Sequence, residues 1–249
     1  MPIGIMSAMR EEIAALIDSI ETTERVVEGM RTYYRGRLWG KEVVLVFSRW
    51  GKVASATTAT HLINDFKVSE ILFTGVAGAI EPSIQIGDVV IGEELYQHDM
   101  DARPLLDRFE VPLLRKKSFS CHKEKNALLS ISVDKFFEKK EDFISEEQLS
   151  FFGISRPKNV TGQIASGDQF VSDPKMIGRI RKDLPGVLCV EMEGAAVAQV
   201  CYEYRLPFNI IRTISDNADD NSHVDFPRFA SEVASRYAQG IIHKYFESF

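Results

Sequence analysis

The sequence has few cysteines and no paired arrangement of them. Cys121, Cys189 and Cys201 are the only three in 249 residues, and none of them forms a CxxC motif. An odd number of scattered cysteines argues against a disulfide framework or a zinc site. The five histidines are also scattered, without the spacing of a helical metal site. We therefore expect reduced thiols in a cytoplasmic protein, with no metal and no other cofactor.

Long apolar runs and an excess of positive charge are missing as well. No segment approaches the roughly eighteen apolar residues of a membrane span, and the start MPIGIMSAMREE lacks the basic region of a signal peptide. We expect neither a membrane anchor nor secretion. The formal net charge of -6 argues against nucleic acid as a partner, because such binding needs a basic face. A small uncharged nucleoside remains compatible with this charge.

Motifs for phosphate binding and for nucleophilic catalysis are absent too. The chain has no GxxxxGK[ST] loop, no GxGxxG fingerprint, no GxSxG elbow and no Ser-His-Asp order. Carboxylates and glycine-rich turns are the groups left for building a site.

Strand-like and helix-like patterns alternate along the chain. Apolar strand-like runs cover 2–9, 70–80, 86–95, 159–171, 186–193 and 207–216, and helical spacing covers 53–66, 173–185, 194–205 and 226–249. Asp173 followed by Pro174 is typical of a helix start. The alternation predicts an α/β fold, with a central mixed, twisted sheet flanked by helices in one domain over residues 1–249. The Lys- and Glu-rich segment 113–158 is expected to be a charged surface excursion of that domain.

Polar or glycine-rich residues follow five of the strand-like runs. These stretches are SAMREE, TGVAGAI, ASGDQFV, VEMEG and RTISDNADD. Ligands in such sheets bind at the carboxyl ends of the strands. The carboxylates available there are Glu11, Glu12, Asp168, Glu191, Glu193, Asp216, Asp219 and Asp220. Paired carboxylates suit acid–base work on a bond that is protonated as it breaks, and glycosidic hydrolysis is the leading reaction of that type.

Six segments, in order and spacing, resemble the 5′-methylthioadenosine/S-adenosylhomocysteine nucleosidases of the nucleoside phosphorylase superfamily. They are GIMSAMREE, GKVASATTAT, LFTGVAGAI, IASGDQFV, VEMEGAAVAQVC and RTISDNAD, and the resemblance covers residues 1 to about 112 and about 159 to 249, leaving out the 113–158 excursion. The resemblance implies a three-layer α/β/α fold and a homodimer. It also implies hydrolysis of the N-glycosidic bond of 5′-substituted adenosines to adenine and the substituted ribose.

The resemblance also implies catalytic roles. Glu12 is similar to the glutamate that activates water, and Asp216 to the general acid that protonates purine N7, with Ser215 orienting it. From the residues alone, Glu12 could instead stabilise a helix N-terminus, the role that we expect for Glu11. Asp219 and Asp220 better suit a turn or a helix cap.

The same resemblance implies a binding site. Phe170 stacks on the purine, the backbone of Val171 reads its edge, and Glu193 accepts hydrogen bonds from the ribose hydroxyls. Glu191 is expected to be structural, as is Arg212 unless it pairs with an acid such as Glu12. The remaining expected contacts are Ala77, Gly78 and Met192 around the ribose and purine, and Met9, Trp50 and Phe226 as apolar walls of the sugar and its 5′ group.

Two positions depart from the family pattern, at Arg49-Trp50 and at Ala102-Arg103. Arg103 could meet the carboxylate of S-adenosylhomocysteine or a polar group such as that of aminodeoxyfutalosine, or it could face solvent. Adenosine and 5′-deoxyadenosine are further possible substrates. A purine nucleoside phosphorylase and a non-catalytic nucleoside-binding or storage protein are the remaining alternatives.

Overall fold

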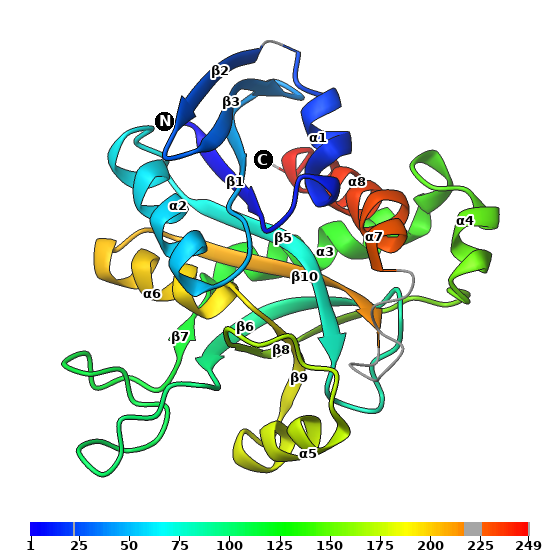
Figure 1. The fold of residues 1–249 in the computed structure, drawn as a ribbon. Helices are drawn as coiled ribbons and strands as arrows, with labels where there is room; N and C mark the ends of the chain where they lie inside the picture. The colour runs from blue at the N-terminus through cyan, green and yellow to red at the C-terminus, as the bar shows by residue number, and fades with distance from the viewer. Residues whose placement is uncertain (22, 217–225, 249) are drawn as a thin grey trace.

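The computed structural model describes residues 1–21, 23–216 and 226–248 (Figure 1). Its described residues form ten strands in one sheet. The strands are β1 (Ile3–Ser7), β2 (Thr23–Glu28), β3 (Arg31–Leu38), β4 (Lys41–Phe47), β5 (Ile71–Ala79), β6 (Val89–Gln97), β7 (Phe119–Ser120), β8 (Asn159–Ser166), β9 (Val187–Glu191) and β10 (Phe208–Asp216).

Helices connect and flank these strands. The α-helices are α1 (Ala14–Asp18), α2 (Lys52–Asn64), α3 (Lys123–Glu138), α4 (Glu146–Phe151), α5 (Pro174–Asp183), α6 (Gly194–Tyr204), α7 (Phe226–Phe229) and α8 (Ser235–Phe246). Short 3-10 helices are η1 (Glu11–Ile13) and η2 (Lys140–Asp142), and a π-helical turn, η3 (Ala230–Ala234), joins α7 to α8. The Asp173 carboxylate accepts a 2.9 Å bond from the Lys175 N–H, which confirms the expected cap of α5.

Strand β5 is the centre of the sheet. It runs parallel to β1 and β10, and its last two residues pair antiparallel with β9. Strands β6 and β8 link β10 back to β9, so that five strands form a closed ring. The sheet is therefore mixed, as predicted, and the ring brings the carboxyl ends of β5, β8, β9 and β10 together.

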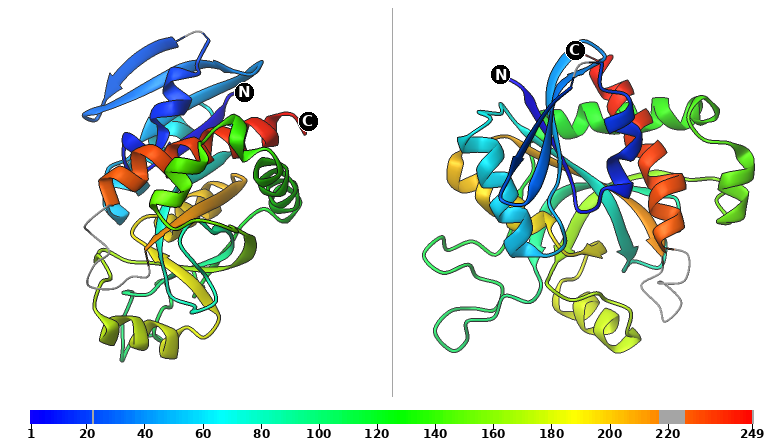
Figure 2. Two further views of the ribbon diagram at one scale, coloured as in Figure 1. Left: turned by 90° about the vertical axis from the view of Figure 1, so that its right-hand side faces the viewer. Right: turned by 45° about the horizontal axis from the view of Figure 1, so that its top comes forward.

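Two apolar cores cover the two faces of the sheet. Helices α2 and α6 lie on one face and contribute Leu62 and Val197. Helices α1, α3 and α8 lie on the other and contribute Leu16, Phe136 and Tyr237 (Figures 1 and 2). This arrangement confirms the expected nucleoside phosphorylase-like three-layer fold. No helix in the described part of the chain is long and apolar enough to cross a membrane.

The charged excursion is more closely integrated than its composition indicates. Leu129, Val133 and Phe136 on α3 are fully buried, and Phe136 packs edge-on against Tyr237 of α8 at 4.8 Å. The lysines and glutamates of α3 therefore form only the outer face of a helix in one layer. The segment therefore contributes a buried inner face to the core as well as a charged outer face.

Candidate active site

A cavity of about 380 Å³ opens at the carboxyl ends of β1, β5, β8, β9 and β10. It brings together every site residue expected from the sequence except Arg103. Those residues are Met9, Glu12, Trp50, Ala77, Gly78, Phe170, Val171, Met192, Glu193, Ser215, Asp216 and Phe226. Five further residues that the sequence did not indicate also line the cavity, each within two positions of an expected residue: Ala8, Val76, Gln169, Val190 and Pro227.

Glu12 is held rigidly at the base of this cavity. Its side chain is 1% exposed, and its Oε2 accepts bonds of 2.9 Å from the N–H groups of both Ala8 and Met9. Its Oε1 accepts a 3.0 Å bond from the Val76 N–H. A Cβ on Gly75 would come 2.8 Å from Oε1, so glycine at that position allows the carboxylate to reach β5.

The surroundings of Glu12 act on its charge in opposite directions. Burial raises its pKa, while the Arg212 guanidinium and the three backbone N–H donors favour the ionised form. Burial is the largest effect, so the net pKa lies above the ordinary value. A buried carboxylate with a raised pKa is a stronger base than a glutamate in water.

Glu191 serves the structure of the site. One of its oxygens accepts a 2.7 Å bond from Arg212 Nη2, and the carboxylate also accepts bonds from the N–H groups of Glu193 and Gly194 and from the Ser166 hydroxyl. These N–H groups begin α6 and have no partner within the helix. Arg212 also stacks on the Phe73 ring, 4.2 Å from its centroid.

Glu193 is two residues further on and faces the cavity. Its Oε1 accepts a 2.8 Å bond from the Gly51 N–H, and it makes no other carboxylate hydrogen bond among the described residues. Burial, reinforced by the negative charge of Glu191, raises the pKa of Glu193. Because the bond from Gly51 goes to Oε1, the second carboxylate oxygen of Glu193 is available to a ligand.

Asp216 ends β10 and also lines the cavity. The Ser215 hydroxyl donates a 2.6 Å bond to its Oδ2. Asp216 is buried, and the bond fixes the orientation of its carboxyl group. Asp219 and Asp220 lie outside the described residues.

The walls of the cavity are mostly apolar. Phe170 is 50% exposed and meets Phe226 edge-on, with ring centroids 6.3 Å apart. The side chain of Val171 packs in a core with Ile180 and Val190, which leaves its backbone as the part that can contact a ligand.

Arg103 does not reach this cavity. Its guanidinium pairs with the Asp101 carboxylate of its own loop, with 2.8 Å from Nε to Oδ1, and it lines a separate cavity with Tyr96 and Arg108. The part of the chain that the structure describes therefore gives Arg103 no contact with the other expected site residues.

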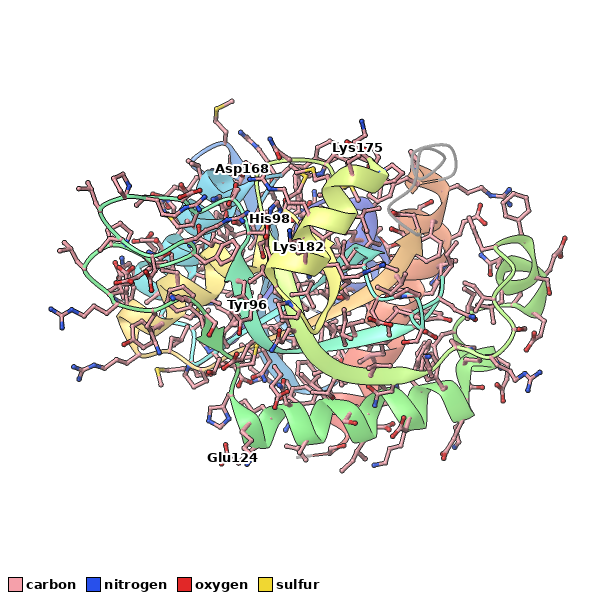
Figure 3. The ribbon with its side chains drawn as sticks, turned by 90° about the horizontal axis from the view of Figure 1, so that it is seen from below. Tyr96, His98, Glu124, Asp168, Lys175 and Lys182 are labelled. Atoms are coloured by element: carbon pink, nitrogen blue, oxygen red, sulfur yellow. The ribbon has the colours of Figure 1, made fainter. Side chains whose placement is uncertain are left out.

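A polar clasp, formed by Lys52, Asp99 and Asp168, ties three loops together at the rim. Lys52 Nζ lies 2.7 Å from Asp99 Oδ1, the Asp168 N–H donates to Asp99 Oδ2 at 2.9 Å, and the Lys52 N–H donates to Asp168 Oδ1 at 2.7 Å. Viewed from below, Asp168 lies close to His98, the residue that follows β6 (Figure 3). The clasp holds the loops that carry Gly51 and Phe170, and nothing in the local sequence indicates it.

A possible metal-ligand group lies outside the cavity lining. Glu28, His61 and Asp65 bring one ligand atom each within 4.8 Å of one another. His61 Nδ1 already lies 2.6 Å from Asp65 Oδ2, and Glu28 and Asp65 are exposed. None of these three residues lines the cavity that holds the carboxylates described above.

Comparisons with known proteins agree with this architecture. The family model described as "Phosphorylase superfamily" matches residues 2–247. A 5′-methylthioadenosine/S-adenosylhomocysteine nucleosidase of Bacillus licheniformis is 35% identical over 94% of both chains. The Streptococcus pneumoniae nucleosidase of the same name, solved with a transition-state inhibitor, is 33% identical over 99% of both chains, with a TM-score of 0.84.

A futalosine hydrolase of Helicobacter pylori is a further structural relative. It is 30% identical, with a TM-score of 0.83 over 100% of this chain and 98% of its own. The matched lengths are nearly complete in every case, and the identities exceed the level at which only a fold is shared. The chain thus belongs to the phosphorylase superfamily and, within it, to the 5′-methylthioadenosine/S-adenosylhomocysteine nucleosidase family.

Proposed function

We propose that the protein is an N-glycosyl hydrolase that cleaves 5′-substituted adenosines, including 5′-methylthioadenosine and S-adenosylhomocysteine, to adenine and the 5′-substituted ribose. The observation that carries the proposal is the placement of Glu12, Glu193 and Asp216 around one cavity. Each carboxylate has a different set of hydrogen-bond partners, and this difference separates their roles.

Glu12 is the general base in this proposal. Its Oε2 already accepts two N–H bonds, whereas Oε1 accepts one. A carboxylate oxygen has two lone pairs, so Oε1 is the atom that can bind a water molecule and take its proton. The deprotonated water then attacks C1′ of the ribose as the bond to the purine breaks.

Asp216 is the general acid. Its proton passes to N7 of the purine, so that adenine leaves as a neutral base instead of an anion. The Ser215 hydroxyl directs the carboxyl group toward the cavity through the 2.6 Å bond to Oδ2. Phe170 stacks on the leaving purine, and the backbone of Val171 binds its edge, with Ala77 and Gly78 beside the ring.

Glu193 binds the ribose hydroxyls through the oxygen that Gly51 leaves available. Positive charge develops on the sugar as the glycosidic bond breaks, and a nearby carboxylate stabilises that charge. Met192 packs against the sugar, and Met9, Trp50 and Phe226 enclose it.

The charges of the cavity favour water over phosphate as the attacking group. No lysine, arginine or histidine is found among the described residues that line it. Phosphate sites depend on cationic side chains and hydrogen-bond donors, and the carboxylate of the general base Glu12 would repel the anion. Adenine release should be equally fast with and without phosphate, and formation of a ribose 1-phosphate would identify a phosphorylase instead.

A non-catalytic binding or storage protein would retain Phe170 and Glu193 but needs no acid or base. The presence of both Glu12 and Asp216 in the cavity supports catalysis. Binding of the nucleoside by the wild type without any release of adenine would favour the storage role.

We also propose that the enzyme is a cytoplasmic homodimer. Leu105 and Leu113, on the segment between β6 and β7, are 87% and 98% exposed, and we place the contact between the two copies on this segment. The three cysteines are free thiols, as expected in a reducing compartment. Sedimentation at micromolar concentration should give the mass of a dimer, and a monomer would contradict this assembly.

A further inference from the structure

A second cavity, of about 630 Å³, adjoins the first. The two share Ala8, Met9, Trp50, Phe226 and Pro227, so these residues form a common boundary. Beyond that boundary the second cavity is lined by Arg10, Glu11, Phe47, Arg49 and Ala230. A ligand that fills the first cavity can therefore extend past Trp50 into the second.

The two cavities differ in charge. The described lining of the first contains carboxylates and no cation, whereas the second contains two arginines and a single glutamate. Neither Arg10 nor Arg49 forms an ion pair within the described part of the chain, unlike Arg103, which is paired with Asp101. A guanidinium carries five N–H donors in a planar arrangement that matches a carboxylate.

The backbone around Arg49 is held in an unusual conformation. Its φ of 74° is uncommon for a residue with a Cβ. The loop is fixed on both sides, since the Ser48 N–H donates to Ser7 O at 2.8 Å and the Gly51 N–H donates to Glu193. Arg49 Nη2 donates to Met30 O, and its other N–H groups are left for a ligand.

The direction of the substrate follows from the proposed function, on which this inference depends. The purine lies between Phe170 and Asp216, and the ribose hydroxyls meet Glu193. The boundary shared by the two cavities is the remaining exit from the ribose. The 5′ carbon therefore points toward Trp50 and Phe226.

The second cavity then receives the 5′ substituent, and we propose that Arg10 and Arg49 select substituents that carry a carboxylate beyond an apolar stem. Phe47, Trp50 and Phe226 offer apolar and aromatic surface to the stem. Two kinds of substituent have this chemistry: an amino acid attached through a thioether, as in S-adenosylhomocysteine, and an aryl carboxylate, as in nucleosides related to futalosine.

A comparison of three substrates, made with the wild type and with each variant, tests the proposal. The kcat/KM for adenine release is measured for S-adenosylhomocysteine, for a 5′-aryl-carboxylate adenosine and for neutral 5′-methylthioadenosine. The variants are the double substitution Arg10→Gln/Arg49→Gln and Arg103→Gln. Arg35→Gln on β3 is a matched control, since Arg35 is also exposed and lines neither cavity.

The double variant should lose about tenfold in kcat/KM for a carboxylated substrate, equivalent to roughly 1.4 kcal/mol, and little for 5′-methylthioadenosine. Added salt should weaken wild-type binding of the carboxylated substrate alone, because it screens exposed charges. Whichever carboxylated nucleoside loses more in the double variant identifies the preferred source of the carboxylate.

An unchanged ratio between carboxylated and neutral substrates in the double variant would overturn the inference, as would a loss confined to Arg103→Gln. The failure of the proposed function is distinct from both, since in that case the wild type would release adenine from none of the three nucleosides.

Discussion

Arg212 and Glu191 form a fully buried ion pair, with 2.7 Å between Nη2 and Oε2. The pair connects β10, which ends at Asp216, to β9, which leads into Glu193. It explains why two glutamates two residues apart have different roles. Glu191 is fully engaged by Arg212, Ser166 and the start of α6, whereas Glu193 keeps one oxygen for a ligand.

Arg212 also sets the basicity of Glu12. Its positive charge lowers the pKa that burial raises. Removing that charge should raise the pKa further, so the acid limb of the kcat/KM profile should move to higher pH, because the base must be ionised to act. An acid limb that stays in place would contradict the coupling.

Arg212→Met alone leaves Glu191 buried and unpaired, which costs about 3–5 kcal/mol of folding free energy. The double variant Arg212→Met/Glu191→Gln removes both charges and should recover part of that stability. It still lacks the cation, so the same shift of the acid limb is expected and can be measured in a folded protein.

Glu193→Gln should make the protein more resistant to unfolding at alkaline pH. The folded-state pKa of Glu193 is raised, so between its unfolded and folded pKa values the folded state binds more protons than the unfolded state. Stability is then lost as the pH rises through that window. The neutral variant escapes this loss, so its Tm advantage over the wild type should be larger at pH 8.5 than at pH 4.5.

Thermal unfolding of the variant and the wild type is measured at both pH values. Any effect of the substitution that does not depend on pH is the same at both and cancels when the two Tm differences are compared. In a chain of this size, 1 kcal/mol corresponds to about 2–4 °C. A Tm difference independent of pH would show that ionisation of Glu193 does not destabilise the folded state. The variant should also lose affinity for the ribose hydroxyls.

Lys52→Met should raise KM by roughly fivefold, equivalent to about 1 kcal/mol, by releasing the loops that carry Gly51 and Phe170. Stability should change little, because partly exposed ion pairs contribute only about 0–1 kcal/mol. Lys117→Met is a matched control, since it removes a 2.8 Å pair with Asp107 on an exposed loop. Lys52→Arg should restore much of the KM, and equal KM values for Lys52→Met and the control would rule out a positioning role.

The sequence predicted most of this site because the expected residues follow strands whose carboxyl ends converge. Met9, Phe170 and Asp216 each lie within a few residues of such an end. The order of the strands then makes them neighbours, although they are more than forty residues apart in the chain.

Contacts formed only by tertiary packing were not predictable. Lys52 meets Asp99 across 47 positions and has no local signal that marks it. Edge strand β2, with charged residues among its valines, lacks a clean alternating pattern and was missed. For Arg103 the sequence left open a contact with a polar 5′ group or exposure to solvent, and its pairing with Asp101, two residues away, is a further contact that the sequence did not indicate.

The most direct test of the account is Asp216→Asn, compared with the wild type for both adenine release and binding of a non-hydrolysable nucleoside analogue. Asp107→Asn, an exposed aspartate remote from the cavity, is the control. Asp216→Asn should bind the analogue with near wild-type affinity and lose about 10²–10⁴-fold in kcat, the contribution of a general acid. Full activity in Asp216→Asn would contradict the account.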